Sequence, residues 1–258
     1  MLNSIVNWAC GFKQDGKPLL GANPLPRDPK QRRTLGWPVE RNQRRPVAAH
    51  DRYIRTQEHA DRVDPVGRLR CILALARFSG RRESAVLSLH ASDLLLSPAR
   101  VRHALAAAGL NEADAQHMPF GAIRWRDEAD KVGLLFITPI SQAARAELDR
   151  YLSKNPRMGE VPLFPAPTVK PKKGQKRQPE RAMPRERAAT WLLRAERLAD
   201  LPKLRGGVFH CYRRLWAIER QHLPPVDVAA AGGWGDTQAL TRIYQRAQPA
   251  GIAAAVNL

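Results

Sequence analysis

Residues 208–247 read VFHCYRRLWAIERQHLPPVDVAAAGGWGDTQALTRIYQRA. His210 and Arg213 lie three positions apart, which places them on one face of a predicted helix. An imidazole and a guanidinium on one face can reach the same oxyanion together. A separate apolar stripe is predicted from Cys211, Leu215 and Ile218, with Trp216 nearby. This segment is therefore expected to be a core helix that also presents a polar pair.

The second half of the stretch predicts two further short helices. Pro224 and Pro225 stop the first helix, and residues 226–231 form a short apolar helix that ends at Gly232 and Gly233. Asp236 or Thr237 is expected to cap the last helix, which carries Tyr244.

Composition points to a polyanionic partner. The 258 residues include 43 Lys plus Arg against 24 Asp plus Glu, for a formal charge of +19 and a pI near 10.9. A basic membrane-surface protein would instead need a basic amphipathic helix, whereas the Arg residues here are spread over many segments. Nucleic acid is therefore the favoured partner.

The same composition sets the expected compartment. No run of eighteen apolar residues predicts a membrane span, and the N-terminus lacks a secretory signal pattern. The three cysteines form no C-x-x-C pair, which is typical of reduced thiols, and no zinc site is predicted. We expect no membrane partner and a cytoplasmic, nucleoid-associated protein.

The rest of the chain predicts a mainly α protein with one small antiparallel β-hairpin (α+β). The hairpin combines strands at residues 122–125 and 133–138 with a charged turn at 127–131. Residues 170–177 form a basic run with almost nothing apolar to bury, so we expect disorder there. Helices are predicted at residues 2–12, from Asp64 or Pro65 to Gly80, and in a short segment around 86–89. Further helices are predicted at 99–110, after the N-cap Ser141, and at 185–200. The buried residues of the last helix are expected to be Trp191, Leu192, Ala195 and Leu198.

A family resemblance follows from these residues. H-x-x-R, a Gly-Gly-Trp turn and a Tyr near the chain end, in that order, resemble the C-terminal half of the catalytic domain of tyrosine recombinases, the phage integrase family. The segment Ser79-Gly80-Arg81-Arg82-Glu83-Ser84 resembles the family motif T-G-x-R-x-S-E, which places Arg82 at its first catalytic arginine. Ala85 departs from the motif, where the family has an acidic residue. The hairpin turn resembles the family's turn that delivers a catalytic lysine, here Lys131.

The resemblance implies DNA strand transfer by a covalent intermediate. Tyr244 would attack a backbone phosphate, forming a 3′-phosphotyrosyl bond and releasing a 5′-hydroxyl. The implied catalytic set comprises Tyr244 (nucleophile), Arg82, Lys131, His210, Arg213 and Trp234. No cofactor and no metal are expected, because side chains supply the cations. The implied partner is double-stranded DNA, bound by a homotetramer.

Plain structural roles compete with each assignment. Arg82 could satisfy carbonyls at a helix end, and Lys131 could be a solvated turn residue. Trp234 and Tyr244 could be core aromatics.

The resemblance also divides the chain and leaves three functions open. Residues 1–47 would be a remnant of the family's N-terminal core-binding domain plus a basic linker, so the chain is expected to be N-terminally truncated. Residues 48–258 would be the catalytic integrase domain. The favoured function is a site-specific recombinase or integrase of a mobile element. The alternatives are a catalytically inactive DNA-binding remnant and a topoisomerase-like relaxing enzyme.

Overall fold

A computed structural model describes residues 9–10, 12–15, 17–20, 46–126, 136–167, 179–204 and 208–243. The chain divides into two compact units, residues 1–44 and 45–258. In the first unit, strands β1 (Lys13–Gln14) and β2 (Lys17–Pro18) pair antiparallel. The sequence did not predict this hairpin. Most of the predicted helix at residues 2–12 and all of the basic run at 170–177 lie outside the described residues.

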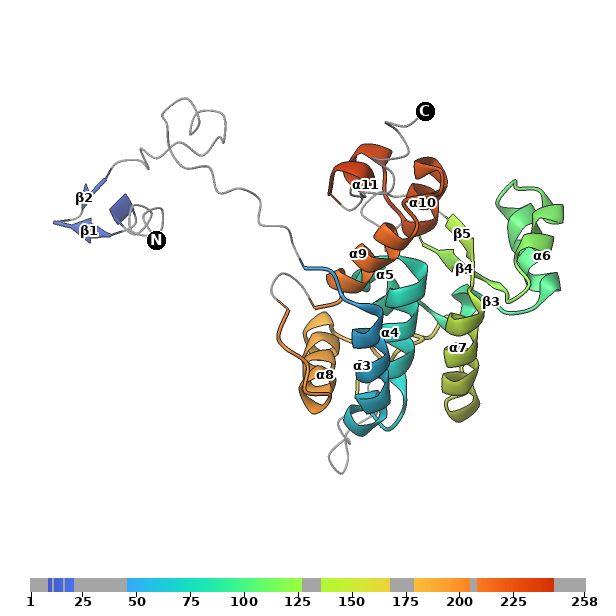
Figure 1. Cartoon of the computed structure of the whole chain (residues 1–258), viewed down its shortest axis with the longest axis horizontal. Coiled ribbons are helices and arrows are strands. Elements are labelled where there is room, and N and C mark those ends of the chain that lie inside the picture. The colour runs from blue at the N-terminus through green and yellow to red at the C-terminus, as the bar shows by residue number, and fades with distance from the viewer. Residues whose placement is uncertain are drawn as a thin grey trace, which may run out of the picture. The chain divides into compact units, whose positions relative to one another are not determined.

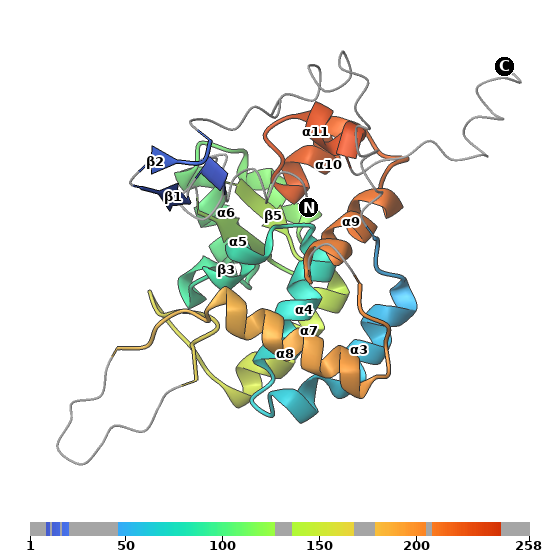
Figure 2. The ribbon, with the colours of Figure 1, turned by 90° about the vertical axis from the view of Figure 1, so that its left-hand side faces the viewer.

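The second unit is built around helix α4 (Arg68–Ser79), which packs against helices on several sides. Its neighbours include α3 (His50–Val63), α7 (Gln142–Lys154) and α8 (Arg185–Leu198). Figure 1 and Figure 2 show α3, α4 and α8 side by side in this half of the unit. The apolar residues of α4 are almost completely buried, notably Leu69, Ile72, Leu73 and Leu75.

Local signals set both ends of α4. The carboxylate of Asp64 accepts the backbone N–H groups of Arg68 and Leu69, which lack partners inside the helix. The helix ends at Gly80, whose φ of 68° is left-handed. A Cβ at Gly80 would lie 2.4 Å from the Trp216 ring, so glycine is required there for space as well as for conformation.

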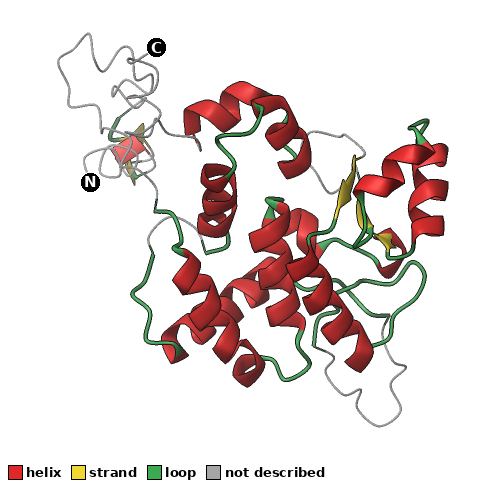
Figure 3. Ribbon diagram, turned by 45° about the vertical axis from the view of Figure 1, so that its right-hand side comes forward, coloured by secondary structure: helices red, strands yellow, loops and turns green. Residues whose placement is uncertain are grey.

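A three-stranded antiparallel sheet flanks the helices, in the order β3-β4-β5. Strands β4 (Ala122–Trp125) and β5 (Phe136–Pro139) form the predicted hairpin, with Trp125 opposite Phe136. Strand β3 (Leu94–Leu95) was not predicted because it has only two residues. Helix α6 (Pro98–Ala107) and the 3₁₀ helix η2 (Glu112–His117) lie beside the sheet (Figure 3). The predicted fold class, mainly α with a small antiparallel sheet, is confirmed.

The C-terminal part holds α9 (His210–Glu219), α10 (Pro225–Gly232) and α11 (Thr237–Ile243). One predicted burial is wrong, because Leu198 of α8 is 45% exposed. In the predicted stripe of α9, Cys211 is buried, Leu215 is half-buried against the core, and Ile218 is half-buried. The buried face of α9 consists of Cys211, Tyr212, Arg213, Arg214, Trp216 and Ala217. No helix within the described ranges has the length and apolar content to cross a bilayer.

Two short elements complete the second unit. Helix α5 (Glu83–Leu87) follows α4 directly, and the 3₁₀ helix η1 (Ala91–Asp93) leads into β3. The predicted inward residues Val86, Leu87 and Leu89 are all buried. The turn between α4 and α5 carries the motif that resembles T-G-x-R.

Candidate functional site

Arg213 joins three segments that are far apart in the sequence. Its side chain is buried, and Nη1 donates to the carbonyl oxygens of Gly80 and Gly232 at 2.6 and 2.7 Å. Gly80 precedes Arg82 by two residues, and Gly232 precedes Trp234 by two residues. The contacts of Arg213 therefore bring the first arginine motif, the H-x-x-R helix and the Gly-Gly-Trp turn together.

The ring of Trp234 packs against the guanidinium of Arg213. The Arg213 guanidinium carbon lies 3.6 Å from the centroid of a Trp234 ring, and Trp234 stacks on Trp216 at 5.9 Å. The chain reaches Trp234 through Gly233 in a left-handed conformation, and a Cβ at Gly232 would lie 1.9 Å from the Trp234 ring. Gly232 is therefore required for space and Gly233 for its backbone conformation, and Trp234 is 5% exposed.

The two arginines after Gly80 occupy different environments. Arg82 is the N-cap residue of α5, with extended backbone angles and a partly exposed side chain. Arg81 is 1% exposed, and it donates from Nε to Ala231 O at 3.0 Å and from Nη2 to Ala230 O at 3.1 Å. Its guanidinium also lies 5.1 Å from the Trp125 ring centroid. Sequence reasoning assigned no role to Arg81, and the Arg-Arg doublet was the only signal for it.

Among the described residues, the two carboxylates nearest in sequence to Ala85, Glu83 and Asp93, are held by other partners. Ala85 is buried in the hydrophobic core, and Glu83 on the same short helix instead pairs with Arg185 of α8 at 3.0 Å. Burial raises the pKa of Glu83 despite that partner. The next candidate acid, Asp93, faces other partners.

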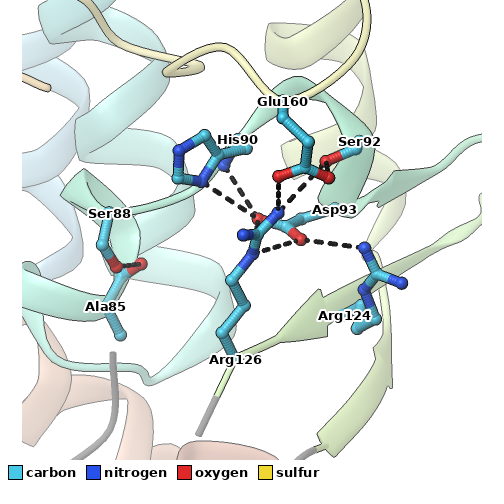
Figure 4. A network of polar contacts seen from close by, with 8 residues as sticks. All are labelled: Ala85, Ser88, His90, Ser92, Asp93, Arg124, Arg126 and Glu160. Carbon is cyan, nitrogen blue, oxygen red and sulfur yellow. Dashed lines mark hydrogen bonds and ion pairs between the residues drawn. The ribbon is translucent and has the colours of Figure 1, made fainter. Parts of the chain in front are cut away.

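Asp93 organises a separate polar network at the start of the sheet (Figure 4). Its fully buried carboxylate accepts bonds from Arg126 Nε at 2.9 and 3.0 Å and from the backbone N–H of His90. Arg124 lies 3.4 Å away, and Arg126 also bonds Ser92 and Glu160. Because Arg126 directly follows β4 and is the last residue described before position 136, this network fixes the end of that strand.

The remaining predicted site residues are placed only in part. His210 begins α9, one turn before Arg213, and is partly exposed. Lys131 and Tyr244 lie outside the described residues. Helix α11 leads towards Tyr244 as far as Ile243, and the Asp236 carboxylate caps it by accepting the Ala239 N–H at 2.6 Å.

Another tyrosine lies close to these residues but is unsuited to nucleophilic attack. Tyr212 is fully buried, and its hydroxyl lies 3.3 Å from Glu196 Oε1. Burial raises the pKa of Tyr212 well above its ordinary value. Within the described ranges, no three His, Cys, Asp or Glu side chains gather in a way that could hold a metal ion.

Comparison with known proteins identifies the fold. No family model and no curated protein sequence matches the chain. Among solved structures, the chain superposes on the XerA recombinase with a TM-score of 0.55 and 15% identity, over 88% of this chain and 70% of that one. The fold is that of a tyrosine recombinase catalytic domain. The resemblance stated from the motifs is confirmed at the level of the fold.

Two complexes of a second recombinase share the tyrosine recombinase fold. The XerH site-specific recombinase bound to difH substrate, before cleavage, matches with a TM-score of 0.55 and 14% identity over all of this chain and 63% of that one. Its post-cleavage complex with palindromic difH matches with a TM-score of 0.53 and 15% identity, over 84% and 54%. The chain thus spans 63% of the XerH chain in the first complex and 54% in the second.

Proposed function

We propose that this protein is a site-specific DNA strand transferase that breaks and rejoins DNA through a 3′-phosphotyrosyl intermediate. The observation that carries the proposal is the contact of Arg213 with Gly80 and Gly232, because it gathers three separate motif segments around one buried guanidinium. The fold shared with site-specific recombinases supports the same function.

The cationic side chains have a defined task in this chemistry. A phosphoryl transition state places negative charge on the non-bridging oxygens, and planar guanidinium groups match such oxygens bidentately. We assign that role to Arg82 and Arg213, with Trp234 N–H as a further donor. Removing one preorganised donor of this kind typically raises the barrier by about 3–4 kcal/mol.

Proton transfer completes the proposed reaction. Tyr244 attacks phosphorus and forms the Tyr–phosphate bond, while the bond to the 5′-oxygen breaks. Lys131 gives a proton to the leaving 5′-oxygen, and His210 bonds to or exchanges a proton with the attacking phenol. An ordinary phenol has a pKa of about 10, so the surrounding cations are needed to favour phenolate. The energy of the phosphate ester is retained in the intermediate, so neither ATP nor a metal is required.

The charge of the chain supports DNA as the substrate. A formal charge of +19 favours binding to the phosphate backbone. We assign the catalytic domain to residues 48–258 and a preceding linker element to residues 1–47. Because strand exchange needs two duplexes, we propose a homotetramer on DNA as the working assembly.

A covalent-capture experiment tests the proposal. The protein is incubated with a labelled library of nicked duplexes that share a randomised centre, denatured in detergent, and searched for a protein–DNA adduct by gel and peptide mass spectrometry. We expect an adduct at Tyr244 that Tyr244→Phe abolishes. Tyr212→Phe is the matched control and should retain the adduct, because Tyr212 is buried and bonded to Glu196.

Other outcomes identify the two alternatives. Salt-sensitive DNA binding without an adduct, over the whole library, contradicts the proposal and leaves the DNA-binding remnant. Relaxation of supercoiled plasmid that lacks any enriched library sequence favours the topoisomerase-like activity. An adduct that survives Tyr244→Phe contradicts the assignment of the nucleophile.

A further inference from the structure

We propose that Arg81 is a positioning residue of the strand-transfer site, an inference that rests on the proposed function. Its guanidinium donates to the carbonyls of Ala230 and Ala231, and Arg213 donates to the next carbonyl, Gly232. Two arginines from different parts of the chain therefore hold three successive carbonyls at the end of α10. We call this set of contacts the α10 clamp.

The electrostatics of a helix end explain why a cation is stable there. The last carbonyls of a helix lack partners within the helix and carry partial negative charge. A buried guanidinium is costly unless its donors are satisfied. Arg81 gains two carbonyl acceptors and a cation–π contact with Trp125, whose ring centroid lies 5.1 Å away. These contacts account for a guanidinium that is 1% exposed.

The position of Arg81 connects the elements that carry the proposed site. Arg82 is its chain neighbour, Trp125 closes strand β4 just before the segment that contains Lys131, and α10 leads into Trp234. One side chain thus sets the spacing of three elements. Because Arg81 is enclosed on all sides, it orients the groups that touch DNA without contacting DNA itself.

Substitutions of Arg81 can separate the effect of its hydrogen bonds from the effect of its side-chain volume. Arg81→Met keeps most of the side-chain volume but removes the side-chain donors to the Ala230 and Ala231 carbonyls, so that, among the described residues, Ala230 keeps only its bond from the Gly233 N–H. Arg81→Lys keeps the charge but cannot place two donors in a planar fork, so it should lie between wild type and Arg81→Met. Arg145→Met is the matched control, since Arg145 Nη1 also donates to two carbonyls, Leu96 at 3.1 Å and Phe120 at 2.9 Å, on a different part of the sheet.

The first measurement is single-turnover adduct formation over a range of protein concentrations. We expect Arg81→Met to lower the rate at saturation by on the order of 10- to 100-fold, because small misplacements of reacting groups have such effects. The half-saturating concentration should stay within about twofold of wild type, because DNA contacts are retained. Arg145→Met should change neither value. Loss of DNA affinity in step with the rate would overturn the proposal, as would a wild-type rate in both Arg81 variants.

The second measurement does not depend on activity. Hydrogen exchange in Arg81→Met should accelerate at Gly233 and Trp234, whose N–H groups bond the Ala230 and Ala229 carbonyls, while α3 exchanges as in wild type. Unchanged exchange at this turn, or equal acceleration in α3, would overturn the α10 clamp as a local device. If wild type forms no adduct, the proposed function fails, and exchange alone then decides whether Arg81 holds α10. Should Arg81→Met not fold, the same readings on Arg81→Lys decide the question.

Discussion

The Arg213 guanidinium of α9 lies over the Trp234 ring, 3.6 Å from its centroid, and the same side chain donates to Gly232 at the end of α10. The same ring stacks on Trp216, so a buried cation, two indoles and two carbonyls form one packed unit.

Trp234→Ala should destabilise the protein substantially. The change removes the ring beneath Arg213 and leaves a cavity against Trp216, and truncations of this size typically cost about 3–5 kcal/mol in the free energy of unfolding. Urea denaturation measures the effect. Trp191→Ala is a control, because Trp191 also lies against an arginine, Arg68, but is only partly buried and should cost less. Equal losses in the two variants would contradict the packing of Trp234.

Two glycines separate conformational strain from steric overlap. Gly80 and Gly109 have similar positive φ values of 68° and 71°, but only Gly80 has a close neighbour, the Trp216 ring. Gly109→Ala should therefore cost about 1–2 kcal/mol, the penalty of the left-handed conformation. Gly80→Ala should cost about 1–3 kcal/mol more, because the surroundings must shift. Thermal or urea unfolding of both variants checks the difference, which should vanish if Trp216 can move freely.

Removing one partner of the buried ion pair between Arg52 and Glu196 should strongly destabilise the protein. The two side chains are 7% exposed each and 2.8 Å apart. Arg52→Met leaves the buried Glu196 carboxylate without its cation, although the Tyr212 hydroxyl still donates to it. Broken buried pairs typically cost about 3–5 kcal/mol. Asp149→Asn breaks the exposed pair with Arg145 and should cost less than about 1 kcal/mol. Chemical denaturation distinguishes the two, and a small loss in Arg52→Met would show that α3 does not depend on this pair.

The stability of Glu83→Gln relative to wild type should increase as the pH rises. Burial raises the pKa of Glu83 above its ordinary value of 4.5. Stability from the neutral carboxyl is therefore complete below pH 4.5 and is lost as the pH rises through the raised folded-state pKa. Glu83→Gln removes that loss, so its stability relative to wild type should increase from pH 4 to pH 7, in urea titrations at each pH.

Glu160→Gln is the control of opposite sign. The pKa of Glu160 is lowered by its bonds from Ser92 and Arg126, so its contribution is present above the ordinary pKa and lost on acidification. The free energy of unfolding of Glu160→Gln should therefore fall relative to that of wild type as the pH rises. If the two variants show the same pH trend, the burial of Glu83 is not the cause.

Much of the fold follows from local sequence signals. Gly80 ends α4, Ser141 caps α7, and Asp236 caps α11 because each needs only neighbouring residues to act. The strands were predicted at 122–125 and 133–138 from their own β-branched and aromatic residues, and the second is observed at Phe136–Pro139. The order of H-x-x-R, Gly-Gly-Trp and Tyr was enough to predict the fold class, because these motifs are carried by contiguous residues.

Only the tertiary structure decided which polar residues are buried. Helix α3 went unpredicted because its buried face is Arg52, Tyr53, Thr56, Gln57 and Ala60, which has no apolar periodicity. The sequence predicted no role for Arg81, because its carbonyl partners lie 149 and 150 residues away in α10. A guanidinium is stable inside a protein only where acceptors from elsewhere in the chain converge on it, and that convergence exists only once the chain has folded.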